Sequence, residues 1–193
     1  MSADFTPNYS DILAGNAEYA ANFHEPELGV EPTRRVVVIA CMDSRMDIFA
    51  LLGLANGESH IIRNAGGVIT DDVIRSLCLS QRKLGTREVI LVHHTDCGLQ
   101  TVTEDAFKAE LEAELGIKPW WALESFVDPY ADVAQSMARL ASSPFISDKD
   151  HVSGFVYELT SRRFNAVAGG STRGADGRTL AAGAGNCQFV AAL

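Results

Sequence analysis

The chain has little of several features that would place it in a particular protein class. Its 193 residues include only four cysteines, at positions 41, 78, 97 and 187, too sparse and too unevenly spaced for a disulfide framework. No apolar run approaches the roughly 18 residues that span a bilayer. The first thirty residues contain Asp4, Asp11 and Glu18 and do not resemble a secretory signal. These absences predict a cytoplasmic protein that has reduced thiols and makes no contact with membranes.

Positive charge is scarce as well. Sixteen Lys and Arg residues stand against 25 Asp and Glu, which gives a formal net charge of −9. No basic cluster is longer than Arg34-Arg35 or Arg162-Arg163, so nothing offsets the repulsion between this chain and a phosphate backbone. Nucleic acid is therefore not an expected partner, and the substrate is expected to be a small molecule.

Apolar residues are plentiful and follow the pattern of alternating strands and helices. Val36 to Ala40 and Val89 to Val92 are continuous apolar runs, which is typical of parallel strands buried on both faces. Helical patterns precede, separate and follow these runs. The sequence predicts an α/β fold with a mostly parallel central sheet of four to five strands flanked by helices, in a single domain over residues 1–193.

Both ends of the chain differ from this central pattern. Residues 1–30 are expected to form a helical arm, because an apolar stripe runs from Tyr9 to Phe23 ahead of the first strand. Gly154 to Leu159 is expected to be the last strand, at a sheet edge. Residues 166–193 form a tail rich in Gly and Ala, to which the sequence assigns no role. Cys78 fits the apolar face of a predicted helix, and Cys187 has no His or Cys beside it, so neither is expected to bind metal.

Chemistry-bearing side chains follow two of the apolar runs. Cys41 ends the first run, and His94 and Cys97 follow the second. Because the carboxyl ends of parallel strands meet at one edge of a sheet, these three residues can bind one zinc ion. Three protein ligands leave a fourth position open, which is typical of a catalytic rather than a structural zinc site.

Two further residues share the loop of Cys41. Zinc bound by two thiolates and a neutral imidazole has a formal charge of zero, so it activates water less strongly than a site with three histidines. Asp43 is the candidate that holds and orients the bound hydroxide. Arg45 can grip this carboxylate with paired hydrogen bonds and keep it off the metal. We therefore expect Asp43 and Arg45 to be catalytic.

Two other classes of zinc protein fit the sequence less well. A nucleobase deaminase needs a His-x-Glu and a Pro-Cys-x-x-Cys motif, and neither occurs. A structural zinc module normally closes on four Cys or His ligands, and neither remaining cysteine has a spacing that supplies an obvious fourth. A zinc lyase or hydrolase that attacks a small, linear carbon electrophile is the leading prediction.

These motifs resemble those of the β-class carbonic anhydrases. The resemblance rests on Cys41-Met-Asp43-Ser-Arg45, on Arg63-Asn64-Ala65-Gly66 and on His94-Thr-Asp-Cys97-Gly98. It implies zinc on Cys41, His94 and Cys97, and reversible hydration of carbon dioxide to bicarbonate by a zinc-bound hydroxide. It also implies a substrate pocket near Ala65, Gly66 and the backbone of Gly98. A homodimer or homotetramer with exchanged N-terminal helices is a further implication.

The chain also departs from the pattern of this family. Plant-type members have a glutamine before the first strand that bonds the substrate, whereas Pro32 and Thr33 occupy that region here. A bulkier apolar residue often stands where Ala65 does. The subgroup with these motifs includes actinobacterial carbonic anhydrases and carbonyl sulfide hydrolases. Hydrolysis of carbonyl sulfide to hydrogen sulfide and carbon dioxide by the same mechanism is therefore the alternative prediction.

Overall fold

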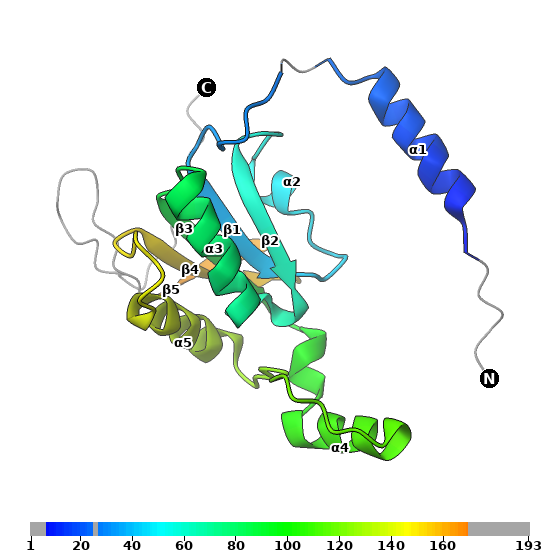
Figure 1. Ribbon diagram of the computed structural model, residues 1–193, viewed down its shortest axis with the longest axis vertical. Helices are drawn as coiled ribbons and strands as arrows, with labels where there is room; N and C mark the ends of the chain where they lie inside the picture. Colours follow the sequence, from blue (N-terminus) through cyan, green and yellow to red (C-terminus); the bar gives the residue numbers. More distant parts are fainter. Residues whose placement is uncertain (1–6, 25–26, 170–193) are drawn as a thin grey trace.

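The computed structural model describes residues 7–24 and 27–169, in which helices and strands alternate as predicted (Figure 1). The elements are α1 (Tyr9–Ala21), β1 (Val36–Cys41), α2 (Ile48–Leu52), β2 (Ser59–Asn64), η1 (Ala65–Gly67), α3 (Asp71–Lys83), β3 (Glu88–His94), η2 (Gly98–Thr101), α4 (Glu104–Leu115), α5 (Pro129–Ser142), β4 (Val152–Glu158) and β5 (Arg163–Val167). Most of the C-terminal tail defined above, and with it Cys187, lies outside the described residues.

The strands form one five-stranded sheet in the order β2-β1-β3-β4-β5. The first four strands are parallel and β5 is antiparallel, which confirms the predicted mostly parallel sheet. All six residues of β1 are buried. The unbroken apolar run from Val36 to Ala40 is thus explained by its position in β1, a strand that is covered on both faces.

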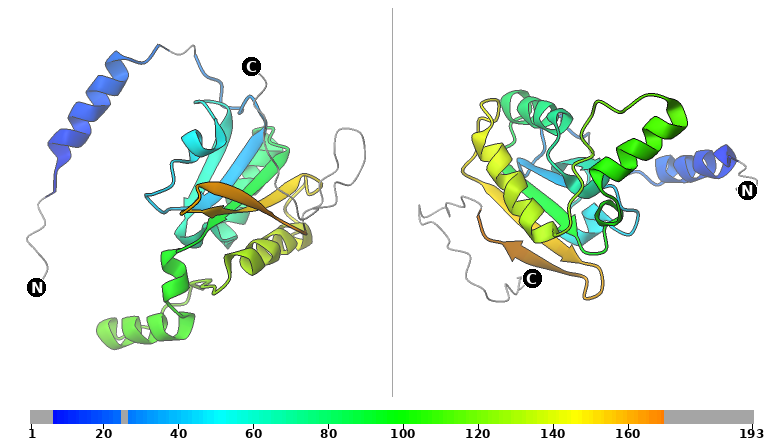
Figure 2. Two further views of the ribbon diagram at one scale, coloured as in Figure 1. Left: turned by 180° about the vertical axis from the view of Figure 1, so that it is seen from behind. Right: turned by 90° about the horizontal axis from the view of Figure 1, so that it is seen from below.

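Helices cover the two faces of the sheet unequally. The side chains of Val37, Ile39, Val89 and Leu91 form one core cluster with residues of α3 and α5. A second cluster, on the opposite face, joins Val38 and Val92 to Met46, Ile48, Leu99 and Phe126. Figure 1 shows α3 and α5 in front of the sheet, and the reverse view in Figure 2 shows α2 on the other side. The predicted flanking helices are confirmed.

The prediction that Gly154 to Leu159 is an edge strand is wrong. This segment belongs to β4, which lies between β3 and β5. The prediction assumed that Tyr157 tolerates solvent, but Tyr157 is buried and its ring lies 5.3 Å from that of Phe164 on β5. Strand β5 was not predicted. It pairs with β4 because a tight turn over residues 159–162 folds the chain back on itself, and its last two residues belong to the predicted tail.

Two helices lie away from this core. Neither α1 nor α4 has a buried residue. Both views of Figure 2 show α1 standing apart from the sheet, and α1 meets the body where the Asn56 side-chain amide donates to the Tyr19 hydroxyl (3.0 Å). Within the described residues, no helix has the length and apolar character needed to cross a membrane.

Candidate metal centre

Three predicted ligands converge at the carboxyl ends of β1 and β3. Cys41 is the last residue of β1, His94 is the last residue of β3, and Cys97 directly precedes η2. The two strands pair in parallel, with Ala40 opposite Val92, so their ends reach the same edge of the sheet. One potential ligand atom from each residue lies within 4.8 Å of the others, and all three residues are buried. The topology thus brings together residues that are up to 56 positions apart in the chain.

His94 has its ring fixed in an orientation suited to metal binding. Its Nδ1 lies 2.9 Å from the Thr95 carbonyl oxygen, an acceptor, so Nδ1 carries the hydrogen in the neutral ring. Nε2 is then left with a lone pair, and it is buried without a hydrogen-bond partner. An orphaned, buried imidazole nitrogen beside two sulfurs fits a metal ion, which would satisfy it.

The two sulfur atoms lie 3.9 Å apart. Two thiolates on one tetrahedral zinc ion, each about 2.3 Å from it, lie about 3.8 Å apart. The pKa of Cys41 is lowered, first by the hydrogen bond from the Cys97 thiol and then by His94 and by the backbone N–H groups of Asp43 and Gly66. The pKa of Cys97 is raised for the same reason, since its proton is held by the Cys41 sulfur. A second thiolate in this buried pair needs a nearby cation, so the donor set fits Zn²⁺.

Asp43 lies beside this cluster in a grip made by Arg45. Its Oδ1 accepts from Arg45 Nε (2.9 Å) and from the Arg45 backbone N–H (2.8 Å), and its Oδ2 accepts from Arg45 Nη2 (2.7 Å). These bonds hold the pKa of Asp43 well below its usual range. Oδ2 also lies 3.7 Å from His94 Nε2. The carboxylate is therefore ionised, fixed and close to the candidate ligand atom of His94.

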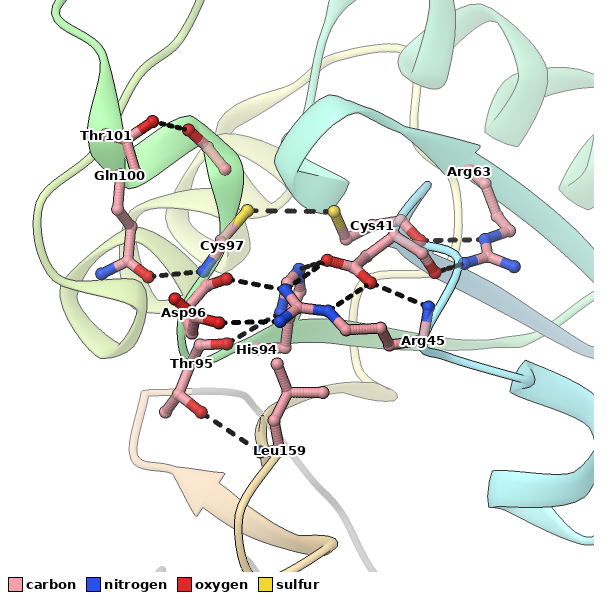
Figure 3. Close-up of polar contacts among 12 residues, drawn as sticks. Cys41, Arg45, Arg63, His94, Thr95, Asp96, Cys97, Gln100, Thr101 and Leu159 are labelled. Atoms are coloured by element: carbon pink, nitrogen blue, oxygen red, sulfur yellow. Dashed lines mark hydrogen bonds and ion pairs between the residues drawn. The ribbon is translucent and has the colours of Figure 1, made fainter.

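Arg63 holds the loop that carries these groups, a contact that the sequence analysis missed. From β2, Arg63 Nε donates to the Cys41 carbonyl (2.8 Å) and Nη2 donates to the Asp43 carbonyl (2.6 Å). Figure 3 shows this guanidinium on one side of the centre, next to Cys41. The available signal was the position of Arg63 near the end of a strand that neighbours β1, but the sequence does not give the order of the strands.

Gln100 is a second residue that the sequence analysis missed. Its Oε1 accepts from the Cys97 backbone N–H (3.0 Å), and its Nε2 donates to the Val127 carbonyl (2.8 Å). The side chain thus ties the Cys97 turn to the segment that leads into α5. Phe126 in this segment packs beside Gly66, so the same amide fixes a wall next to the centre.

The predicted substrate-binding residues are placed differently from one another. Gly66 is buried, and its backbone contributes to the lowered pKa of Cys41; a methyl group on its Cα would lie only 2.6 Å from Leu99 Cδ2 and 3.0 Å from Phe126 Cε1. Ala65 is partly buried, whereas Gly98 is exposed and has open space where a side chain would be. The centre therefore has an apolar wall on the Gly66 side and an open approach at Gly98.

His93, adjacent to His94, points away from the centre. Its Nε2 lies 2.7 Å from Asp132 Oδ2 on α5, and the ring is fully buried. The opposite directions of His93 and His94 follow from the alternation of side chains along a strand.

Comparisons with known proteins agree with this geometry. A family model described as carbonic anhydrase matches residues 36–163. Beta-carbonic anhydrase 1 from Mycobacterium tuberculosis is 48% identical over 157 residues, which cover 81% of this chain and 96% of that protein. Carbon disulfide hydrolase from Acidithiobacillus thiooxidans is 32% identical over 154 residues, which cover 69% of this chain and 77% of that protein. A solved carbonic anhydrase from Streptococcus mutans matches with a TM-score of 0.78 and 38% identity, over 84% of this chain and 99% of that one. The matched segment contains every candidate ligand.

Proposed function

Because the chain belongs to the β-class carbonic anhydrases, a family of lyases, we propose that it hydrates carbon dioxide reversibly to bicarbonate with one zinc ion per chain. The observation that carries the proposal is the convergence of Cys41, His94 and Cys97 with an orphaned Nε2 on His94. Zinc held there would act as a Lewis acid that lowers the pKa of a water molecule toward neutrality, so that the water can attack a carbon electrophile.

The chain's own residues orient the reactants in this proposal. Asp43 cannot donate a hydrogen bond while Arg45 keeps it ionised, so its Oδ2 can only accept. It therefore fixes an attacking water by accepting one O–H and leaves an oxygen lone pair of that water directed at the substrate. Leu99 and Phe126 offer an apolar surface to the linear substrate next to the backbone of Gly66.

Hydrolysis of carbonyl sulfide is the second candidate function. Sulfur is larger and more polarizable than oxygen and accepts hydrogen bonds less well, so an apolar wall without a polar donor favours it. Thr33 stands in the region where plant-type members have the glutamine that bonds the substrate. It lies near the amino end of β1, opposite the end that bears Cys41, and its backbone N–H donates to the Gly57 carbonyl there, so within one chain it offers no polar donor to the centre. The similarity to a carbon disulfide hydrolase supports this candidate as well.

The assembly and location that we propose follow from surface and thiol chemistry. The exposed apolar side chains of α1 favour a homodimer or homotetramer, because a single chain leaves them in water. Reduced thiols at Cys41 and Cys97 favour the cytoplasm.

One experiment separates the two substrates. We expect kcat/KM, measured on one zinc-loaded preparation, to be higher for carbon dioxide than for carbonyl sulfide, with sulfide release still measurable. Sulfide release no greater than that of a zinc-free control would remove the second activity. A higher value for carbonyl sulfide would reverse the assignment, and no turnover of either gas would overturn the proposed function.

A further inference from the structure

A second carboxylate grips the arginine that holds Asp43. Arg45 Nη1 donates to Asp96 Oδ2 (2.7 Å), and Arg45 Nη2 donates to the Asp96 carbonyl oxygen (2.8 Å). Figure 3 shows Arg45 extending from the β1 loop to the turn that contains Asp96. We propose that Asp96 is a positioning residue that fixes the Arg45 guanidinium and, through it, the carboxylate of Asp43. This role rests on the function proposed above.

The exposure of Arg45 explains why one carboxylate is a weak anchor. The Arg45 side chain is 48% exposed, and an isolated ion pair at such a position is screened and opposed by the entropy of a long side chain. With Asp96, the guanidinium bonds two acceptors on each of two loops, one after β1 and one after β3. Two fixed points leave the planar group little freedom to rotate, so the Asp43 oxygens stay where Arg45 places them.

The backbone at Asp96 is shaped for this contact. Its φ is +56°, in the left-handed region that residues other than glycine seldom adopt. This conformation directs both the carbonyl and the carboxylate of one residue at Arg45. Aspartate tolerates the left-handed region better than most residues, so turn chemistry alone accounts for the residue type. The two hydrogen bonds to Arg45 are a separate observation, and they are what the proposal rests on.

The other side of the turn is anchored to β4. The Thr95 N–H donates to the Tyr157 carbonyl (3.0 Å), and the Thr95 hydroxyl accepts from the Leu159 N–H (3.2 Å). Cys97 follows on the next residue, buried and tied to Gln100. The Asp96 side chain is 79% exposed, so the turn, whose backbone is held on both sides, and not burial, is what fixes its position against Arg45.

Two substitutions separate the contact from the turn. Asp96→Gly removes the carboxylate and suits the left-handed backbone, so the turn keeps its conformation. Asp96→Asn also tolerates that backbone and keeps an amide oxygen for Arg45, but it removes the charge. We expect the glycine variant to keep one zinc per chain and its KM for carbon dioxide, and to lose about tenfold in kcat, as is usual when a partner of the immediate catalytic shell is lost. The asparagine variant should keep at least about a third of the wild-type kcat.

A measurement that does not depend on turnover follows Arg45 directly. In protein labelled with ¹⁵N-arginine, a guanidinium held on both sides exchanges its Nε hydrogen slowly and gives a resolved signal, which Arg45→Lys identifies by its loss. We expect this signal to persist in Asp96→Asn and to broaden or vanish in Asp96→Gly. If the wild-type protein has the signal but hydrates no carbon dioxide, the proposed function fails while the role of Asp96 in holding Arg45 is still tested.

Arg162→Gly is the matched control. Arg162 also has a left-handed φ, +60°, and lies in the exposed turn before β5. It shows what the glycine substitution alone does to melting temperature, and we expect it to leave kcat unchanged. Wild-type kcat and an unchanged Arg45 signal in Asp96→Gly would overturn the proposal, because the turn would then explain Asp96 entirely. Equal losses in Asp96→Gly and Asp96→Asn would also overturn it, because the negative charge and not the hydrogen bond would be responsible.

Discussion

The strand-end centre and the N-terminal helix α1 are opposite cases within one chain. At the centre, Cys41 and His94 are buried, and hydrogen bonds from β2, β3 and η2 fix the loops around them. On α1, Ile12 and Leu13 are 70% and 68% exposed. The contacts of the centre come from the chain itself, whereas the apolar face of α1 has no cover among the described residues. One chain therefore completes the candidate ligand set, whereas the arm is left for the second molecule that we propose.

The largest expected effect comes from removing a candidate ligand. His94→Ala takes away the orphaned Nε2, and we expect the variant to lose zinc affinity by more than the 10- to 100-fold that loss of a ligand's supporting partner typically costs. Metal analysis after dialysis against a chelator measures this, with circular dichroism to check the fold. His151→Ala is the control, since His151 is exposed and lies directly before β4, at the amino ends of the strands and so at the opposite edge from the centre. Full zinc content in His94→Ala would remove the ligand assignment.

The next effect concerns the carboxylate beside the ligands. Asp43→Asn keeps the size of the side chain, but an amide nitrogen replaces one of the acceptor oxygens. We expect zinc content to be retained and kcat for carbon dioxide to fall by about 100-fold or more, the scale typical of a lost proton-handling group. Rates near those of the wild type across the pH range would contradict the assignment of Asp43.

The centre was predictable because its determinants are local in sequence. Cys41, Asp43 and Arg45 occupy one loop, and His94 and Cys97 occupy another, so only the parallel pairing of two strands had to be inferred. The bounds of α4 also follow from local signals, since the Thr103 side chain caps its start and Gly116 ends the helix in a left-handed conformation. Thr70 is a residue type that favours N-caps, and its hydroxyl accepts from the Val73 N–H at the start of α3.

The missed features depend on contacts between distant segments. Gln100 bonds Val127, 27 residues away, and Arg63 bonds a loop 20 residues earlier. No residue pattern predicts such hydrogen-bond partners before the strand order is known. Strand β5 was missed because its turn has no Asn-Gly or Asp-Gly signal; Arg162 adopts the left-handed conformation instead. The residues that cover α1 cannot be named from the pattern of one chain if, as we propose, its partner is a second molecule.

A substitution on α1 tests the comparison between the centre and the arm from the side of the arm. We expect the wild-type protein to be at least a dimer, and Leu13→Ser to weaken association while leaving the zinc content of the centre intact. Burying one leucine contributes about 1.5–3 kcal/mol, and a symmetric interface contains it twice, so the dimer dissociation constant should rise by about 100-fold or more.

Light scattering over a dilution series measures this association. Asn16→Ser, an exposed polar position on the same helix, is the matched control. A wild-type protein that stays monomeric at micromolar concentration would contradict the interpretation of the exposed stripe.

The smallest expected effect is at Gly98, where the centre meets solvent. A methyl group added to Gly98 would have no heavy atom within 4 Å, and its φ is not in the left-handed range. Gly98→Ala should therefore change the free energy of unfolding by no more than about 0.5 kcal/mol, as is usual for an exposed position.

If the substrate approaches along the Gly98 backbone, the added methyl group narrows that approach and raises KM several-fold with little change in kcat, because binding is impaired equally in the ground and transition states. Gly29→Ala, at another glycine with open space around it, controls for the substitution itself. An unchanged KM for both carbon dioxide and carbonyl sulfide would show that the substrate does not approach along Gly98 and would favour the apolar side of Gly66. An alanine substitution cannot test that side in the same way, because a methyl group on Gly66 would collide with Leu99 and Phe126 and disturb the fold.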